Sequence, residues 1–152
     1  MRNVFCAVAA LAALAVTPSP AAEVNVGQLA IDAAWSRPGM PARPAAAYME
    51  ISNSGETADR LVAARAPAFG KVELHTVEMT DGVMKMRPVE SIEIPAGETV
   101  MLAPGGFHLM LFGAETPFTE GENFELTLVF AEAGEATVEV AVERRAGGGM
   151  EH

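Results

Sequence analysis

Turn-forming residues interrupt the chain so often that no helix-like periodicity beyond residue 22 is sustained over ten residues. Between the interruptions, apolar and polar residues alternate, which is the period of a half-buried β-strand. The 14 glycines and 10 prolines supply many of the interruptions. Short alternating segments separated by turns predict a single all-β domain, either an antiparallel β-sandwich or a Greek-key barrel.

The clearest predicted strand covers residues 45–53, where Ala47, Met49 and Ile51 alternate with more polar neighbours. Segment 36–44 holds three prolines and a glycine, so it is predicted to be a loop. Asp81-Gly82 is a strong signal for a two-residue β-hairpin turn. The remaining predicted strands cover residues 24–35, 61–66, 71–80, 83–89, 107–112, 124–130 and 138–142.

The first 22 residues have the features of a cleavable signal peptide. Arg2 is followed by an apolar run over residues 4–16, and small residues precede predicted cleavage after Ala21 or Ala22. Cleavage removes Cys6, the single cysteine, so the mature chain is expected to have no thiol, no disulfide and no thiolate ligand. We expect one domain over residues 23–145, followed by a disordered Gly-rich tail over 146–152.

The charge and the motifs exclude several classes of function. The chain has 10 basic and 20 acidic side chains, a net charge of −10, which argues against a nucleic-acid partner. No apolar run in the mature chain is long enough to span a membrane. Neither a Ser-His-Asp set, nor a paired general acid and base, nor a phosphate-binding Gly loop is visible. We therefore do not expect an enzyme.

Four side chains stand out by type and spacing: His75, Met86, His108 and Met110. Alone, a strand histidine is more often structural than a ligand, and a lone methionine usually fills space. Together, two imidazoles and two thioethers are soft, neutral ligands that suit Cu(I) better than Mg, Ca or Mn. The set therefore predicts one Cu(I) per chain.

The hairpin turn predicts the relative positions of two of these four residues, His75 and Met86. With Asp81 and Gly82 as the loop residues, Met86 lies opposite Val77 and becomes a diagonal neighbour of His75, at roughly 7 Å. His108 and Met110 are two residues apart on one strand and share a face. The sequence thus predicts two strand-borne pairs of one imidazole and one thioether, but periodicity does not show whether the pairs face each other.

The other methionines are less informative. Met79 and Met84 are expected to lie opposite each other near the hairpin tip, either as a packing pair or as auxiliary thioethers, and we favour packing or at most a secondary role in metal binding. Met40, Met49 and Met101 are interpreted as space-filling residues.

Three segments surround the four side chains: Val-Glu-Leu-His at 72–75, Asp-Gly-Val-Met-Lys-Met-Arg-Pro at 81–88, and Pro-Gly-Gly-Phe-His-Leu-Met-Leu at 104–111. Together with the spacing of the four side chains, these segments resemble one known family, the periplasmic copper chaperones of the PCu(A)C type. The resemblance extends from about Trp35 to the last predicted strand, so it covers nearly the whole mature chain.

The resemblance implies a cupredoxin-like β-sandwich that binds one Cu(I) through His75, Met86, His108 and Met110. It also implies a periplasmic, monomeric protein that delivers copper to the assembling copper site of cytochrome c oxidase, alongside a thiol chaperone of the Sco type. Relatives often carry a His- and Met-rich C-terminal extension that takes up Cu(II). Here only Met150 and His152 match it, which leaves a second, Cu(II) site unsupported.

Two alternatives remain open at this stage. The same four ligands would serve a copper buffer of the export compartment that has no dedicated acceptor, and a transfer assay separates that role from delivery. A structural or adhesive β-sandwich with incidental histidines and methionines is the other, and a metal titration would exclude it.

Overall fold

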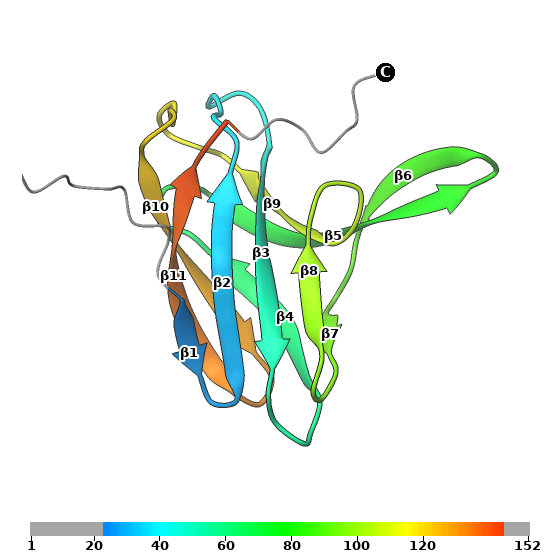
Figure 1. Ribbon diagram of the computed structural model, residues 1–152. Coiled ribbons are helices and arrows are strands. Elements are labelled where there is room, and N and C mark those ends of the chain that lie inside the picture. The colour runs from blue at the N-terminus through cyan, green and yellow to red at the C-terminus, as the bar shows by residue number, and fades with distance from the viewer. Residues whose placement is uncertain (1–22, 145–152) are drawn as a thin grey trace, which may run out of the picture.

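The computed structural model describes residues 23–144, and its regular elements are all strands (Figure 1). The predicted signal peptide with Cys6, and the predicted tail with Met150 and His152, lie outside the described residues. The strands are β1 (Val24–Val26), β2 (Leu29–Ser36), β3 (Ala45–Asn53), β4 (Asp59–Arg65), β5 (Lys71–Thr80), β6 (Val83–Pro88), β7 (Ile92–Ile94), β8 (Thr99–Leu102), β9 (His108–Phe112), β10 (Asn123–Phe130) and β11 (Gly134–Val142).

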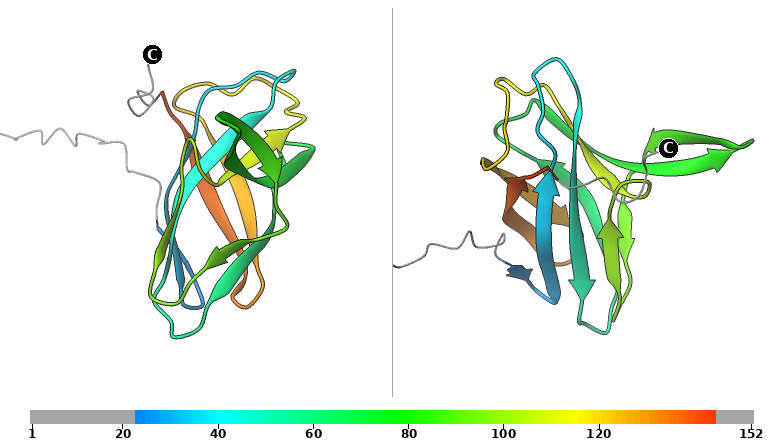
Figure 2. Two further views of the ribbon diagram at one scale, coloured as in Figure 1. Left: turned by 90° about the vertical axis from the view of Figure 1, so that its right-hand side faces the viewer. Right: turned by 45° about the horizontal axis from the view of Figure 1, so that its top comes forward.

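The strands form one mixed sheet in the order β6-β5-β9-β3-β2-β11-β10-β4-β7, with β1 beside β2 and β8 beside β3. Among the pairings of residues 23–144, only that of β2 with β11 is parallel. The sheet curls so that its two halves face each other across a core, as the two further views show (Figure 2). Among the described residues the structure has no helix, as predicted.

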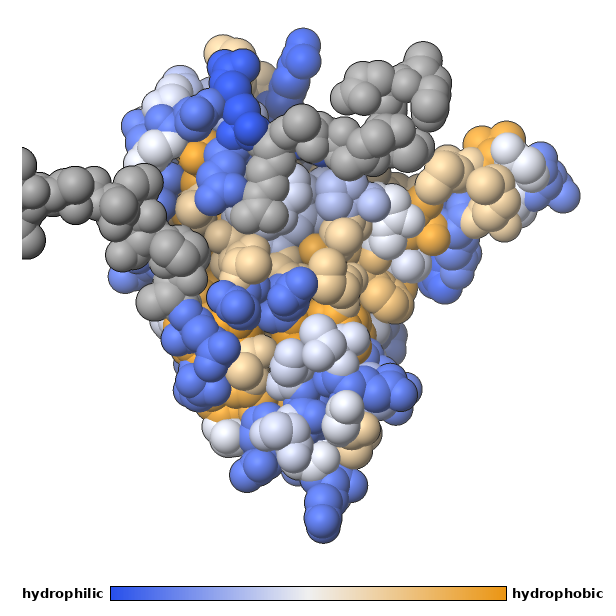
Figure 3. All heavy atoms as spheres, viewed as in Figure 1, coloured by the Kyte–Doolittle hydropathy of each residue, from blue (hydrophilic) through white to orange (hydrophobic). Residues whose placement is uncertain are grey.

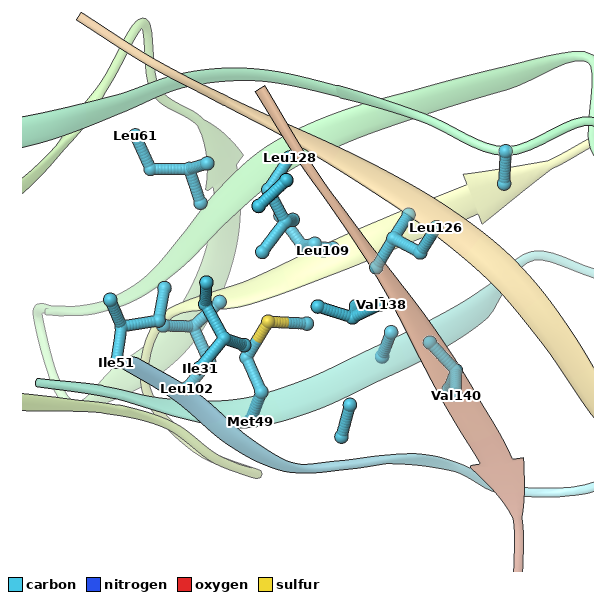
Figure 4. Close-up of a cluster of buried hydrophobic side chains, with 14 of the residues drawn as sticks. Ile31, Met49, Ile51, Leu61, Leu102, Leu109, Leu126, Leu128, Val138 and Val140 are labelled. Carbon is cyan, nitrogen blue, oxygen red and sulfur yellow. The ribbon is translucent and has the colours of Figure 1, made fainter. Parts of the chain in front are cut away.

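Side chains from both halves of the curled sheet meet in the core (Figure 4). Their spacing of two along each strand is the alternation seen in the sequence. Each fully buried aliphatic side chain stabilises the fold by roughly 1.5–3 kcal/mol. The centre of the core includes Ile31, Met49, Ile51, Leu61, Leu102, Leu109, Leu126, Leu128, Val138 and Val140.

Two local features differ from the predicted strands. Residues 24–35 form two strands instead of one, because Gly27 adopts a positive φ of 56° and reverses the chain. The short strands β7 and β8 were not predicted; each has only three or four residues, too few for alternation to be recognised.

A bulge in β2 changes the direction of the side chains that follow it, including Trp35. The pairing of β2 with β3 shifts register between Asp32 and Trp35, and Ala33 has a φ of 53°. An extra residue of this kind re-aims the side chains that follow it. Beyond the bulge, Trp35 lies opposite Tyr48, with ring centroids 4.8 Å apart.

The hairpin of β5 and β6 projects from the body of the molecule, as Figure 1 and the right-hand view of Figure 2 show. The first half of β5 is held by β9 over residues 71–75, whereas its second half pairs with β6 alone. Every residue of β6 is exposed. Residues 23–144 include no helix long and apolar enough to cross a membrane.

Candidate metal centre

The two histidines lie side by side on neighbouring strands. His75 on β5 is the direct cross-strand partner of His108 on β9, and their ring centroids are 5.8 Å apart. Directly opposite residues in a sheet project from the same face. Glu73 and Met110 form the next pair along on that face. The pairing of β5 with β9 therefore places His75 beside the pair of His108 and Met110, which periodicity alone could not show.

Met86 joins this face through the hairpin. The observed register pairs Val77 with Met86 and His75 with Pro88, as the turn at Asp81-Gly82 predicts. Met86 and Met110 also line one surface groove, together with residues of the loop between β2 and β3. All four predicted ligands thus project from one face of the β6-β5-β9 segment. Their roles as ligands stay a prediction.

One nitrogen of His108 is committed to the backbone and the other is free. Nδ1 lies 2.9 Å from the carbonyl oxygen of Gly106. A carbonyl only accepts, so Nδ1 carries the proton, and in the neutral ring Nε2 keeps its lone pair. The residue is only 2% exposed, and Nε2 is buried without a hydrogen-bond partner.

His75 repeats this arrangement with the opposite nitrogens. Its Nε2 lies 2.8 Å from Oε2 of Glu73, whose carboxylate accepts the proton. Nδ1 is buried without a partner. Among residues 23–144, His75 Nδ1 and His108 Nε2 are the only buried side-chain nitrogen or oxygen atoms left without one. Buried polar atoms are rarely left unpaired, and metal-binding imidazoles usually donate their other N–H in this way.

The surroundings keep His108 neutral and Glu73 charged. Burial lowers the pKa of His108 below its usual value, and the neighbouring His75 adds to that effect, while the bond to Gly106 partly opposes it. The hydrogen bond from Lys71 lowers the pKa of the Glu73 carboxyl, and the bond from His75 lowers it further. The lowered pKa of His108 favours its neutral form, which is the form of imidazole that binds a metal ion.

Sequence reasoning missed several residues around the histidines. Glu73 was not predicted as a partner of His75, although its position two residues earlier on the same strand was a usable signal. The Tyr48 ring lies 6.5 Å from that of His108, and the Phe112 ring lies 6.3 Å from that of His75. These ring contacts follow from the strand pairing, which alternation does not reveal.

The chemistry of the four donors is that of a soft site. Within the part of the chain that the structure describes, no group of three or more His, Cys, Asp or Glu side chains is placed to hold a metal ion. Hard cations such as Ca²⁺ and Mg²⁺ need several oxygen ligands, so this face does not suit them. Two imidazole lone pairs and two thioethers suit a soft monovalent ion.

The remaining methionines divide into two groups. Met49 is buried in the core, which confirms its predicted role as a space-filling residue. Met40 and Met101 are exposed, so their prediction as space-filling residues is wrong. Met79 and Met84 are cross-strand partners as expected, and both are exposed, so their role as a packing pair or as auxiliary thioethers stays a prediction. The projecting hairpin has no core beneath its tip for them to fill.

Comparison with solved structures confirms the cupredoxin-like fold and the resemblance to PCuAC domains. The apo PCuAC domain of PmoF1 has a TM-score of 0.69 and 30% identity, and the match covers 80% of this chain and 98% of that domain. The copper-bound PCuAC domain of PmoF2 has a TM-score of 0.69 and 32% identity, covering 80% and 97%. The solution structure of CuI-DR1885 from Deinococcus radiodurans has a TM-score of 0.60 and 29% identity, covering 83% of each chain.

The sequence comparisons give the family. The family described as putative lipoprotein LpqE-like matches residues 29–142, and the chain belongs to it. The putative lipoprotein Lxx21020 of Leifsonia xyli subsp. xyli is 35% identical over 135 residues, which are 88% of this chain and 78% of that protein. A description of these relatives as lipoproteins supports export of the chain.

Proposed function

We propose that the chain binds one Cu(I) through His75, Met86, His108 and Met110. The observation that carries this proposal is the pair of buried, unpartnered nitrogens, His75 Nδ1 and His108 Nε2, on adjacent strands. Leaving two such atoms unpaired costs free energy unless something binds them. Copper is also present in two of the similar structures, the copper-bound PmoF2 domain and CuI-DR1885.

The donor set favours Cu(I) over Cu(II). Thioethers are soft, and Cu(II) prefers harder donors in a tetragonal arrangement. All four donors are neutral, so the bound ion keeps its full positive charge. A site that offers thiolates would then compete successfully for the ion. These properties suit a carrier that releases its metal.

We further propose that the chain is a periplasmic chaperone and not an enzyme. As a monomer, it would deliver copper to the assembling copper site of cytochrome c oxidase, either directly or with a Sco-type thiol chaperone. The support is the resemblance to PCuAC domains, together with a release-competent ligand set. A copper buffer without a dedicated acceptor is the alternative, because the same ligands serve it.

X-ray absorption on the copper-loaded protein tests the ligand types. We expect a first shell of mixed sulfur and nitrogen, from two thioethers and two imidazoles. A shell of oxygen and nitrogen alone would contradict the assignment. If the protein did not bind Cu(I) at all in a titration, a structural or adhesive function would be the remaining alternative.

Substitutions test the individual thioethers. Met86→Leu and Met110→Leu should weaken Cu(I) binding strongly, while each lowers the free energy of unfolding by less than about 1.5 kcal/mol, because leucine conserves apolarity and volume. Met49→Leu, in the core, is the matched control and should leave Cu(I) binding unchanged. Equal loss of affinity in all three variants would show that the ligand set is wrong.

A transfer assay separates delivery from buffering. The Cu(I)-loaded protein is mixed anaerobically with the copper-site domain of the oxidase subunit, with and without a Sco-type protein. Delivery predicts movement of copper to the acceptor faster than its release to a small chelator of similar affinity. Equal rates would favour the buffer.

A further inference from the structure

The exposed apolar side chains of this protein are mostly methionines. Among the described residues, the exposed large hydrophobic side chains are Met40, Met79, Val83, Met84, Met86 and Met101. Four of these six lie on the β5–β6 hairpin. In Figure 3 apolar residues are visible along this projecting hairpin, next to strongly hydrophilic ones. Exposed apolar residues gathered on one element point to a function and not to packing.

Three of these methionines share one face of the hairpin. Met79 is the direct partner of Met84, and Met86 lies two residues farther along the strand of Met84. Directly opposite Cβ atoms lie roughly 4.5–5.5 Å apart, and diagonal neighbours about 7–8 Å. Methionine has three rotatable bonds before its terminal methyl group, so three such sulfurs can converge on one ion.

The opposite face of the hairpin is charged. Glu78 and Arg87 form an ion pair there, and Lys85 lies opposite Glu78. Charges on both faces would keep the hairpin soluble equally well. Thioethers on one face only, at 67%, 55% and 58% exposure for Met79, Met84 and Met86, therefore call for a separate explanation.

We infer that Met79, Met84 and Met86 form a second, exposed thioether site that captures Cu(I) before it reaches the two histidines. Thioethers are soft ligands, which suit Cu(I) better than the hard cations Mg, Ca or Mn. Met86 belongs both to this face and to the proposed centre, so it connects the two. Three neutral ligands in open solvent hold the ion more weakly than the histidine-containing centre, so the ion moves inward.

The inward step is a ligand exchange. A copper–sulfur bond to Met79 or Met84 breaks as a bond to His75 Nδ1, His108 Nε2 or the Met110 sulfur forms. The copper stays Cu(I), and no proton is transferred, because every ligand is neutral before and after. The direction of transfer rests on the proposed function, but ion binding by the hairpin face does not.

Methionine-methyl NMR of the full chain tests the site itself, with Cu(I) added anaerobically as the probe. In the wild type, we expect the Met86 and Met110 methyl signals to shift with the first equivalent, and those of Met79 and Met84 to shift when more is added. In His75→Ala/His108→Ala, which lacks the proposed centre, the signals of Met79, Met84 and Met86 should move together. Unmoved Met79 and Met84 signals in both proteins would overturn the site.

Loading kinetics test the capture role. Met79→Leu/Met84→Leu should slow the loading of the first Cu(I) several-fold and leave its equilibrium affinity unchanged. Met101→Leu removes a thioether of similar exposure, 54%, from β8 and should load at the wild-type rate. An unchanged rate in the double variant would overturn the capture role. The double variant could also load slowly only when a protein donates the Cu(I), while the Met79 and Met84 methyl signals do not move. That result would overturn metal binding by the hairpin face and would indicate that the face docks the donor.

Discussion

Each histidine of the proposed centre is fixed by a neighbour that only accepts hydrogen bonds. The Gly106 carbonyl holds the proton of His108 on Nδ1, and the Glu73 carboxylate holds that of His75 on Nε2. The two rings therefore present different nitrogens, yet both present a lone pair. In both cases the accepting group lies two residues before the histidine in the chain: Glu73 on β5, and Gly106 in the turn that precedes β9.

Removing the charge that orients His75 should weaken the centre. We expect Glu73→Gln to lower Cu(I) affinity about 10–100-fold, the usual effect of losing a group that orients a ligand. Competition titration against a chelator measures this. Glu78→Gln is the matched control, because Glu78 pairs with Arg87 on the opposite face of the hairpin. Equal effects in the two variants would contradict an orienting role for Glu73.

Burial of His108 should make the stability of the metal-free protein depend on pH. Its pKa is lowered in the folded state, so at mildly acidic pH the unfolded chain binds more protons than the folded one. We expect the free energy of unfolding to fall as pH decreases from about 6.5 toward the folded-state pKa. Denaturant unfolding across this range measures it.

A variant isolates the contribution of His108. His108→Gln removes the titrating ring, so the fall in stability between neutral and mildly acidic pH should become smaller. An NMR titration of the metal-free wild type should also place the pKa of His108 below the ordinary value of about 6.5. A pKa at or above that value would show that burial does not dominate at this ring.

At the scale of the elements, the turn chemistry of the β5–β6 hairpin sets the position of Met86. Asp81 and Gly82 have φ values of 52° and 77°, and a two-residue type I′ turn needs positive φ at both positions. The turn fixes which residues lie opposite each other, and so it sets Met86 diagonal to His75. A shift of one residue would turn Met86 to the charged face.

Straining this turn should affect copper binding more than straining another. Gly82→Ala adds a Cβ at positive φ, which costs about 1–2 kcal/mol locally, with no atoms within 4 Å to clash. We expect faster amide exchange in the hairpin and weaker Cu(I) binding. Gly97→Ala is matched in φ, at 72°, and in free space, but lies in the β7–β8 turn. It should lose comparable stability and keep its Cu(I) affinity.

The sequence predicted local features well because they depend on neighbouring residues. The hairpin register over residues 75–88 and the bounds of β3 follow from turn residues and alternation, and the structure confirms both. The pairing of β5 with β9 joins segments about thirty residues apart, and no local signal specifies it. The sequence therefore could not predict that His75 lies beside His108, although it identified each histidine as a candidate ligand.

At the scale of the whole molecule, the proposed centre is separate from most of the core. His75, Met86 and Met110 lie outside the buried cluster that joins the two halves of the sheet. We therefore expect the metal-free protein to stay folded, with the same β-sheet signal in circular dichroism. Added Cu(I) should stabilise it through linkage, by about 2.7 kcal/mol when free ligand is 100-fold above the dissociation constant.

Chelation should reverse this stabilisation. Thermal unfolding of the copper-loaded protein, before and after a Cu(I) chelator is added, measures the change in Tm. His75→Ala/His108→Ala should show a much smaller increase with copper. Unfolding upon chelation would instead show that the metal holds the fold together.

The parallel pairing of β2 with β11 is the whole-molecule feature that sequence reasoning did not provide. It involves two pairs, Ala141 with Trp35 and Val142 with Ser36, at the ends of both strands. Alternation predicts a strand and its buried face but carries no information on the direction of its neighbour. The predicted antiparallel sandwich is thus right in class and differs at this junction.

The position of β6 at the end of the sheet has a consequence for self-association. Within the described residues β6 pairs only with β5, so its outer edge offers free backbone groups to which a strand of another molecule could add. Lys85, Arg87 and Pro88 are the kinds of residue that discourage such addition. An open edge beside a row of thioethers would otherwise favour aggregation. The charged edge should therefore discourage the addition of a second molecule while the proposed thioether face stays exposed to solvent.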